Sequence, residues 1–153
     1  MKYRNIFTLL AKDISTDAGD GMNSYTKVLD TFNAEIDVNE LAKQGITLGE
    51  QPIVLPINFS IGTSWSLGKT TDEDTFLTVK INIVDPTGKD LGGPSQEHQL
   101  PAGIDRININ FNNNGLPLTV AGNYVLQSIL TDREDKVLAQ GEYPFIVNVT
   151  ERK

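Results

Sequence analysis

The sequence lacks cysteine altogether and has a single histidine, His98. The absence of cysteine excludes a disulfide framework, a thiolate zinc site and a cysteine nucleophile. Neither a Gly-x-Ser-x-Gly elbow nor a metal-binding spacing surrounds the histidine. We therefore expect no catalytic residue and no cofactor, and we predict that the protein is not an enzyme.

Basic residues and long apolar runs are also scarce. Thirteen Lys and Arg stand against twenty Asp and Glu, which gives a net charge of -7. Such a charge opposes binding to nucleic acids and anionic membrane surfaces. No apolar run approaches the ~20 residues of a membrane span, and the short run IFTLLA is followed at once by Lys12 and Asp13, unlike a secretory leader. These features predict a cytoplasmic protein with no nucleic-acid or membrane partner.

The apolar residues that are present suffice for one core. A length of 153 residues and an apolar fraction of 39% suit one folded domain. The sequence contains no internal repeat and no linker rich in proline, glycine or serine. We therefore expect a single domain over residues 1–153.

Alternation of apolar and polar residues with a period of two is the strongest pattern in the chain, and it indicates β-strands. In PINFSIGTSW the apolar residues share one parity while Ser60 and Ser64 lie on the other, which predicts a strand with one buried and one exposed face. The same alternation predicts strands within residues 75–85 and 104–111. The polar turn DREDK is expected to join two more strands into a hairpin.

Two further strands are expected in the N-terminal part, one over about residues 3–11 and one over residues 24–33. The segment DVNELAKQG instead predicts a helix, because Asp37 can accept hydrogen bonds from the next turn and Gly45 can end it. Strands at short intervals with one short helix near residues 38–44 predict an all-β fold. We expect an antiparallel β-sandwich of about eight or nine strands, either immunoglobulin-like or C2/jelly-roll-like.

Two segments resemble parts of known sandwich proteins. AGNYVLQSILTD is similar to the penultimate strand of immunoglobulin-like modules, in which the tyrosine hydroxyl ties down the preceding loop; the matching residues are Gly122, Tyr124 and Leu126. FTLLAKDISTDAGDGMNSYTKVLDTF resembles the opening of a family of small uncharacterised proteins of bacteria and their phages, with an apolar strand, a glycine-containing turn and a second strand ending in Asp30 and Phe32. This resemblance implies an all-β fold and a bacterial or phage origin, and it carries no activity and no site.

The segment STDAGDGMNSY, residues 15–25, is the most similar to a metal site. Asp13, Ser15 and Asp17 fall at the first, third and fifth positions of an EF-hand-like calcium loop, and Asp20 is a further weak candidate. The match then fails, because alanine and serine stand where the loop needs glycine and glutamate. We favour a strand-to-strand turn with glycines at positive φ, and calcium binding by these aspartates is the alternative.

Other features are candidates for a site only in particular arrangements. The acidic segments Asp72–Asp74 and Asp132–Asp135 could join a metal site if the fold places them beside the first acidic turn. SLGKT, residues 66–70, is similar to the end of a phosphate-binding loop but lacks the earlier glycine and the following helix. Trp65 and the four tyrosines could form a contact surface for carbohydrate or protein, although core packing is the expected role.

No pattern in the sequence identifies an activity, so the function is a choice among hypotheses. We favour a non-enzymatic protein-interaction or structural module whose loops or exposed edge bind another protein or a second copy of the chain. The alternative is a calcium- or carbohydrate-binding sandwich that uses acidic loops. A hydrolase with two loop carboxylates is the least favoured hypothesis.

Overall fold

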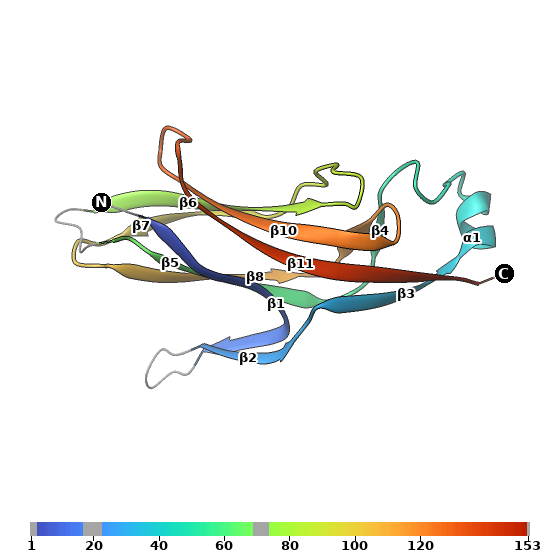
Figure 1. Cartoon of the computed structure of the whole chain (residues 1–153), viewed down its shortest axis with the longest axis horizontal. Helices are drawn as coiled ribbons and strands as arrows, with labels where there is room; N and C mark the ends of the chain where they lie inside the picture. Colours follow the sequence, from blue (N-terminus) through green and yellow to red (C-terminus); the bar gives the residue numbers. More distant parts are fainter. Residues whose placement is uncertain (1–2, 17–22, 69–73, 153) are drawn as a thin grey trace.

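The computed structural model describes residues 3–16, 23–68 and 74–152, which form β-strands and one short helix (Figure 1). The all-β sandwich expected from the sequence is confirmed, and so is the helix, α1 (Val38–Lys43). The described residues contain eleven strands rather than eight or nine. The difference arises because one expected strand is divided in two and short strands flank the longer ones.

Two sheets make up the sandwich, and a short ribbon lies beside them. Sheet A has the order β2-β1-β5-β8 and consists of β1 (Arg4–Thr16), β2 (Asn23–Val28), β5 (Phe59–Ser66) and β8 (Arg106–Asn113). Sheet B has the order β3-β11-β10-β6-β7 and consists of β3 (Thr31–Asp37), β6 (Thr75–Val84), β7 (Ser95–Leu100), β10 (Gly122–Thr131) and β11 (Val137–Arg152). The ribbon pairs β4 (Ile53–Leu55) with β9 (Leu116–Leu118). One pair, β3 with β11, is parallel, and the other pairs are antiparallel.

The core lies between the inner faces of sheets A and B, where the period-two alternation placed it. On β6 and β8 every second side chain is buried: Leu77, Val79, Ile81, Ile83, Ile107, Ile109 and Phe111. Trp65 on β5 is fully buried, and its indole Nε1 donates to Thr63 Oγ1 at 2.9 Å. Core packing is therefore the role of this tryptophan, as expected.

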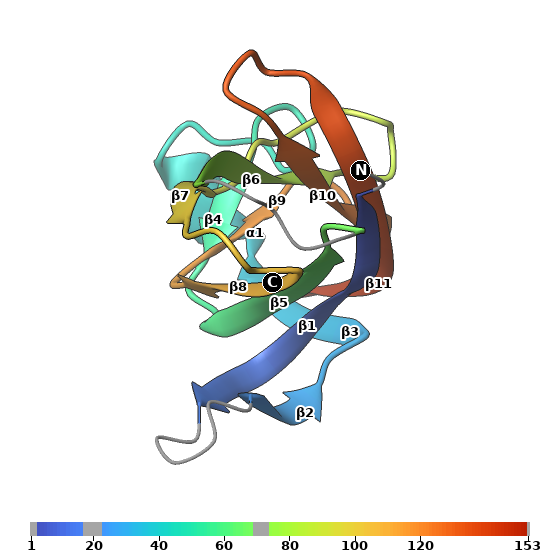
Figure 2. The same ribbon diagram turned by 90° about the vertical axis from the view of Figure 1, so that its left-hand side faces the viewer.

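The prediction that the strand now seen as β5 has one exposed face was wrong, because both faces are covered. Ser60 and Ser64 on its outer face are only 4% and 0% exposed. In the β1–β2 hairpin, strand β2 and the end of β1 bend over the outer face of β5, where Tyr25 and Ile14 both approach Gly62. Figure 2 shows these two strands extending below β5. A Cβ added at Gly62 would lie 2.6 Å from Tyr25 Cε1, so the Tyr25 ring packs directly on this glycine. The hairpin thus supplies an outer cover that strand alternation does not reveal.

The N-terminal half also differs from the expected pattern. The first strand continues to Thr16 instead of ending near residue 11, and residues 24–33 form parts of two strands in different sheets. Backbone hydrogen bonds of two successive residues, Leu29 and Asp30, explain the division between β2 and β3. Leu29 N donates to Leu10 O of sheet A at 2.8 Å, whereas Asp30 O accepts from Ile146 N of sheet B at 2.9 Å. The chain therefore crosses between the sheets at this point.

The hydroxyl of Tyr124 ties down the loop before β10, as the immunoglobulin-like pattern implies. It donates to Val120 O at 2.6 Å and accepts from Thr119 N at 3.1 Å. The ring is fully buried and stacks on Phe145, with 5.4 Å between the ring centroids. This bond fixes the connection between β9 and β10.

Candidate functional site

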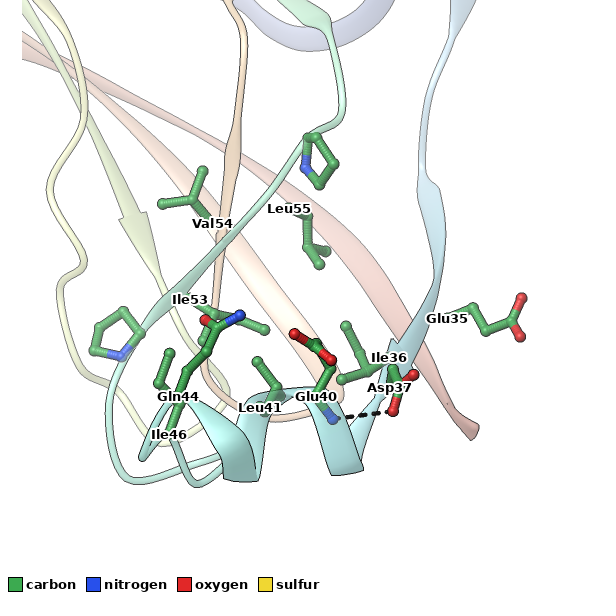
Figure 3. A pocket seen from close by; sticks show the side chains of 12 residues that line it. Glu35, Ile36, Asp37, Glu40, Leu41, Gln44, Ile46, Ile53, Val54 and Leu55 are labelled. Carbon is green, nitrogen blue, oxygen red and sulfur yellow. Dashed lines mark hydrogen bonds between the residues drawn. The ribbon is translucent and has the colours of Figure 1, made fainter. Parts of the chain in front are cut away.

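A groove of about 500 Å³ lies where sheet B, the β4–β9 ribbon and α1 meet (Figure 3). One wall is the end of β3 and the start of α1, and the other is the segment 52–56, which contains β4. The lining residues are Glu35, Ile36, Asp37, Glu40, Leu41, Gln44, Ile46, Pro52, Ile53, Val54, Leu55 and Pro56. The groove is therefore built from two extended segments, 35–37 and 52–56, and α1 with the loop after it closes one end.

The helix that closes one end of the groove is held by its terminal hydrogen bonds. Asp37 Oδ1 accepts from the backbone N of Asn39 and Glu40, both at 3.1 Å. At the other end, Gly45 adopts a φ of 72°, and Ile46 N donates to Leu41 O at 2.9 Å. The capping aspartate and the terminal glycine are those expected from the sequence.

Aliphatic side chains form the floor of the groove. Ile36 and Leu55 are 6% exposed, and Leu41 and Ile53 are partly buried against the core. Figure 3 shows Ile36 and Leu41 directed toward the space between the two walls. Val54 is different, because 71% of its surface is exposed on the second wall. The floor is therefore the apolar surface that a ligand group meets inside the groove, and Val54, which Figure 3 shows directed away from Leu55, lies at the outer edge of the second wall.

Carboxylates form the charged part of the rim. Glu35, Asp37 and Glu40 line the groove, and none of the described lining residues is basic. The guanidinium group of Arg152 lies 3.6 Å from Glu35 Oε1 and 3.9 Å from Asp37 Oδ2. Lys43 Nζ lies 3.8 Å from Glu40 Oε2. The side chains of these pairs are 42–75% exposed, and such surface ion pairs are weak. A ligand cation can therefore compete for these carboxylates.

The structure gives each predicted metal candidate a local role or leaves it outside the described residues. Asp13 Oδ1 accepts from its neighbour Ile14 N at 2.9 Å. Asp17 and Asp20 lie outside the described residues. Across the ranges 3–16, 23–68 and 74–152, no group of three or more His, Asp or Glu is placed to hold a metal ion.

The other two acidic segments, around Asp74 and around Asp132, lie close to each other but not to the β1–β2 hairpin. Asp74 and Asp132 line the same shallow hollow, but the β1–β2 hairpin lies on the opposite side of the molecule (Figures 1 and 2). Asp132 Oδ1 accepts from the backbone N of Glu134 and Lys136, and Asp74 accepts from Ala102 N. Asp132 therefore stabilises its own turn, whereas Asp74 holds the turn between β7 and β8. Asp72 lies outside the described residues.

The remaining sequence candidates are dispersed over the molecule. His98 is on the edge strand β7, where Nε2 lies 3.1 Å from Gln96 Oε1. In SLGKT, Gly68 N donates to Ser66 Oγ, and the following Lys69 and Thr70 lie outside the described residues. Of the tyrosines, Tyr124 is fully buried, and Tyr3, Tyr25 and Tyr143 are partly buried. The structure does not bring these residues together.

Sequence reasoning missed both the groove and one buried carboxylate. Asp85 is 5% exposed and accepts four hydrogen bonds, from Thr119 Oγ1, from Thr87 N and Oγ1, and from Lys89 N. Its position at the start of the turn DPTGKD was a usable signal, because aspartate often accepts bonds from the following turn. For the groove, the sequence offered only a weaker signal, the prolines Pro52 and Pro56 on either side of β4.

Comparisons with known proteins assign no family to this chain. No protein-family model matches the sequence, and no curated protein matches it. One structural match is to a crystal structure of Bacteroides uniformis β-glucuronidase, with a TM-score of 0.48 and 17% sequence identity. The match covers 65% of this chain and 12% of that enzyme chain, so this chain spans a small part of its length. The resemblance to small bacterial and phage proteins stays a prediction.

The described residues form a single short helix. Within the described ranges, no helix is long and apolar enough to cross a membrane, and α1 has six residues.

Proposed function

We propose that the protein is a non-enzymatic interaction module that binds a short segment of a partner protein in the groove between α1, β3 and β4. The segment would carry an aliphatic side chain next to a lysine or arginine. The observation that carries this proposal is an apolar floor bordered by three carboxylates, with no basic side chain among the described lining residues. The partner's apolar group would occupy the floor, and its cation would lie at the rim.

The size and shape of the groove suit part of a peptide. A volume of about 500 Å³ falls in the usual range for ligand sites, about 300–1,000 Å³. The walls are two extended segments, 35–37 and 52–56 (Figure 3). An extended peptide can lie between such walls and place alternate side chains on the floor.

Recognition in this groove would depend on side chains more than on strand pairing. Pro52 and Pro56 flank β4 and have no backbone N–H, so they limit the addition of a strand along it. The rim charges would add orientation and specificity, because complementary charges at an interface act mainly on selectivity and association rate. Replacing one floor or rim residue should therefore change which peptides bind.

Selection from a random peptide display library tests this proposal. The wild-type protein should enrich peptides with an aliphatic residue next to lysine or arginine. Val54→Asp places a charge on the exposed aliphatic wall and should reduce binding of those peptides at least tenfold, measured by fluorescence anisotropy. Glu40→Lys should remove the preference for basic residues, because it reverses the charge at the rim.

Val137→Asp is the matched control, because Val137 is also exposed, at 47%, and does not line the groove. This variant should enrich the same peptides as the wild type. Enrichment of no common pattern, or equal binding by Val54→Asp and Val137→Asp, would contradict the proposal.

A further inference from the structure

Strand β8 is a long edge of sheet A with a regular pattern. It pairs with β5 from Arg106 to Asn113 without a register shift. Its inner face carries Ile107, Ile109 and Phe111, which are buried, and its other face carries asparagines. Asn108 and Asn112 are exposed. Asparagine is disfavoured in strands, so its repetition on one edge strand calls for a physical reason.

The backbone groups on the free side of β8 are those of the asparagines. Ile109 O accepts from Thr63 Oγ1 of β5 at 2.8 Å, and Asp105 O accepts from Leu67 N at 2.9 Å, so the odd-numbered residues direct their backbone groups toward β5. Successive residues of a strand direct these groups to opposite sides. Asn108, Asn110 and Asn112 therefore present theirs outward. In the part of the chain that the structure describes, no other segment forms a backbone hydrogen bond with them.

The other sheet edges carry features that hinder pairing with another chain. Prolines flank both β4 and β7, at 52 and 56 and at 94 and 101. The edge strand β3 has Glu35 and leads into α1, and β2 is short, with Lys27 at a φ of 54°. Such prolines, charges and irregularities are the usual protection of an edge. Strand β8 has none of these features between residues 107 and 113.

We propose that β8 is a self-association edge, where two copies of the chain pair their β8 strands antiparallel about a two-fold axis at Asn110, so that Asn108 of one copy lies opposite Asn112 of the other. The strand is complementary to itself in this orientation, because asparagines face asparagines on one side and isoleucine or phenylalanine faces the same types on the other. Residues 106–114 contain no acidic side chain although the chain has twenty, so the overall negative charge is not concentrated at this contact. Pairing would join two copies of sheet A into one continuous eight-stranded sheet.

Charge substitutions at the exposed asparagines test this inference. The wild-type protein should form a dimer in sedimentation-velocity experiments at high micromolar concentration. The double variant N108K/N112K places lysines of one strand beside those of the other, and N108E/N112E does the same with glutamates, so each alone should be monomeric. An equimolar mixture of the two variants should regain a dimer of mixed composition, because lysines then face glutamates.

The double variant N33K/N123K is a control of equal charge, since both of its positions are exposed in sheet B. It should dimerise as the wild type does. A circular dichroism spectrum and an unfolding curve for each variant show whether it is folded, and a folded monomer is the expected result for both β8 variants. A monomeric wild type, a dimer formed by N108K/N112K alone, or a mixture that stays monomeric would overturn the inference. None of these results depends on peptide binding in the groove, so the two proposals can fail separately.

Discussion

Asp85 shows how one residue can be charged inside a packed fold. Burial alone raises the pKa of its carboxyl group, but hydrogen bonds from Thr119, Thr87 and Lys89 outweigh burial and lower the pKa from its ordinary 3.8 to about 2. Donors to the charged form are the reason, because they favour the carboxylate over the neutral acid. The bond from Thr119 Oγ1, at 2.6 Å, links this turn to the end of β9.

The lowered pKa predicts how stability depends on pH. The folded state holds the Asp85 proton less tightly than the unfolded chain, so the stabilisation is complete above about pH 4 and is lost as pH falls toward 2. With about 1.4 kcal/mol per pKa unit, the contribution is about 2 kcal/mol. Asp85→Asn should lower the free energy of unfolding by about this amount at neutral pH and remove the loss between pH 4 and 2. Urea denaturation at a series of pH values measures both effects.

Asp90→Asn is the control, because Asp90 is exposed in the same turn and accepts one bond, from Gly92 N. It should retain the pH dependence of the wild type. Parallel loss of stability in Asp85→Asn and the wild type below pH 4 would show that Asp85 is not the residue responsible.

At the scale of elements, α1 is the least independent part of the groove. A helix of six residues is not stable alone, and none of its residues is fully buried. Its position depends on the two hydrogen bonds that Asp37 accepts from Asn39 N and Glu40 N, and on the bonds at its C-terminal end. The helix should therefore open locally while the sandwich stays folded.

Asp37→Ala is expected to destabilise α1 without unfolding the sandwich. Loss of an N-cap costs about 1 kcal/mol, and here the cost falls on α1 and not on the core. Backbone amides of residues 38–46 should exchange hydrogen several-fold faster, and the unfolding midpoint of the whole protein should change little. Glu35→Ala is the control, since Glu35 also pairs with Arg152 but does not cap the helix. Equal exchange rates in the two variants would contradict the role of the cap.

Local elements were predictable from the sequence because their causes are local. The alternation in β6 and β8, the cap of α1 and the turn between β10 and β11 are each determined by a few neighbouring residues. The division between β2 and β3 was not predictable, because it depends on bonds from residues 29 and 30 to distant strands. The outer cover of β5 was missed for the same reason.

At the scale of the whole molecule, the groove is a product of the sandwich topology. The chain passes from sheet A to sheet B before β3, forms α1, and returns through β4 toward β5. The sequence alone marks Asp37 as a helix cap and Pro52 and Pro56 as residues that limit strand pairing. Nothing in their spacing indicated that the two segments face one another across a cavity, because that arrangement requires both sheets to be in place.

Hydrogen–deuterium exchange with and without a selected peptide tests the central claim, that the groove is the binding surface, most directly. The peptide should slow exchange in residues 35–46 and 52–56 of the wild-type protein and leave the β10–β11 turn unchanged. In Val54→Asp the same peptide concentration should give little protection, whereas Val137→Asp should behave as the wild type. Protection confined to another surface, or protection of the groove segments that persists unchanged in Val54→Asp, would contradict the account.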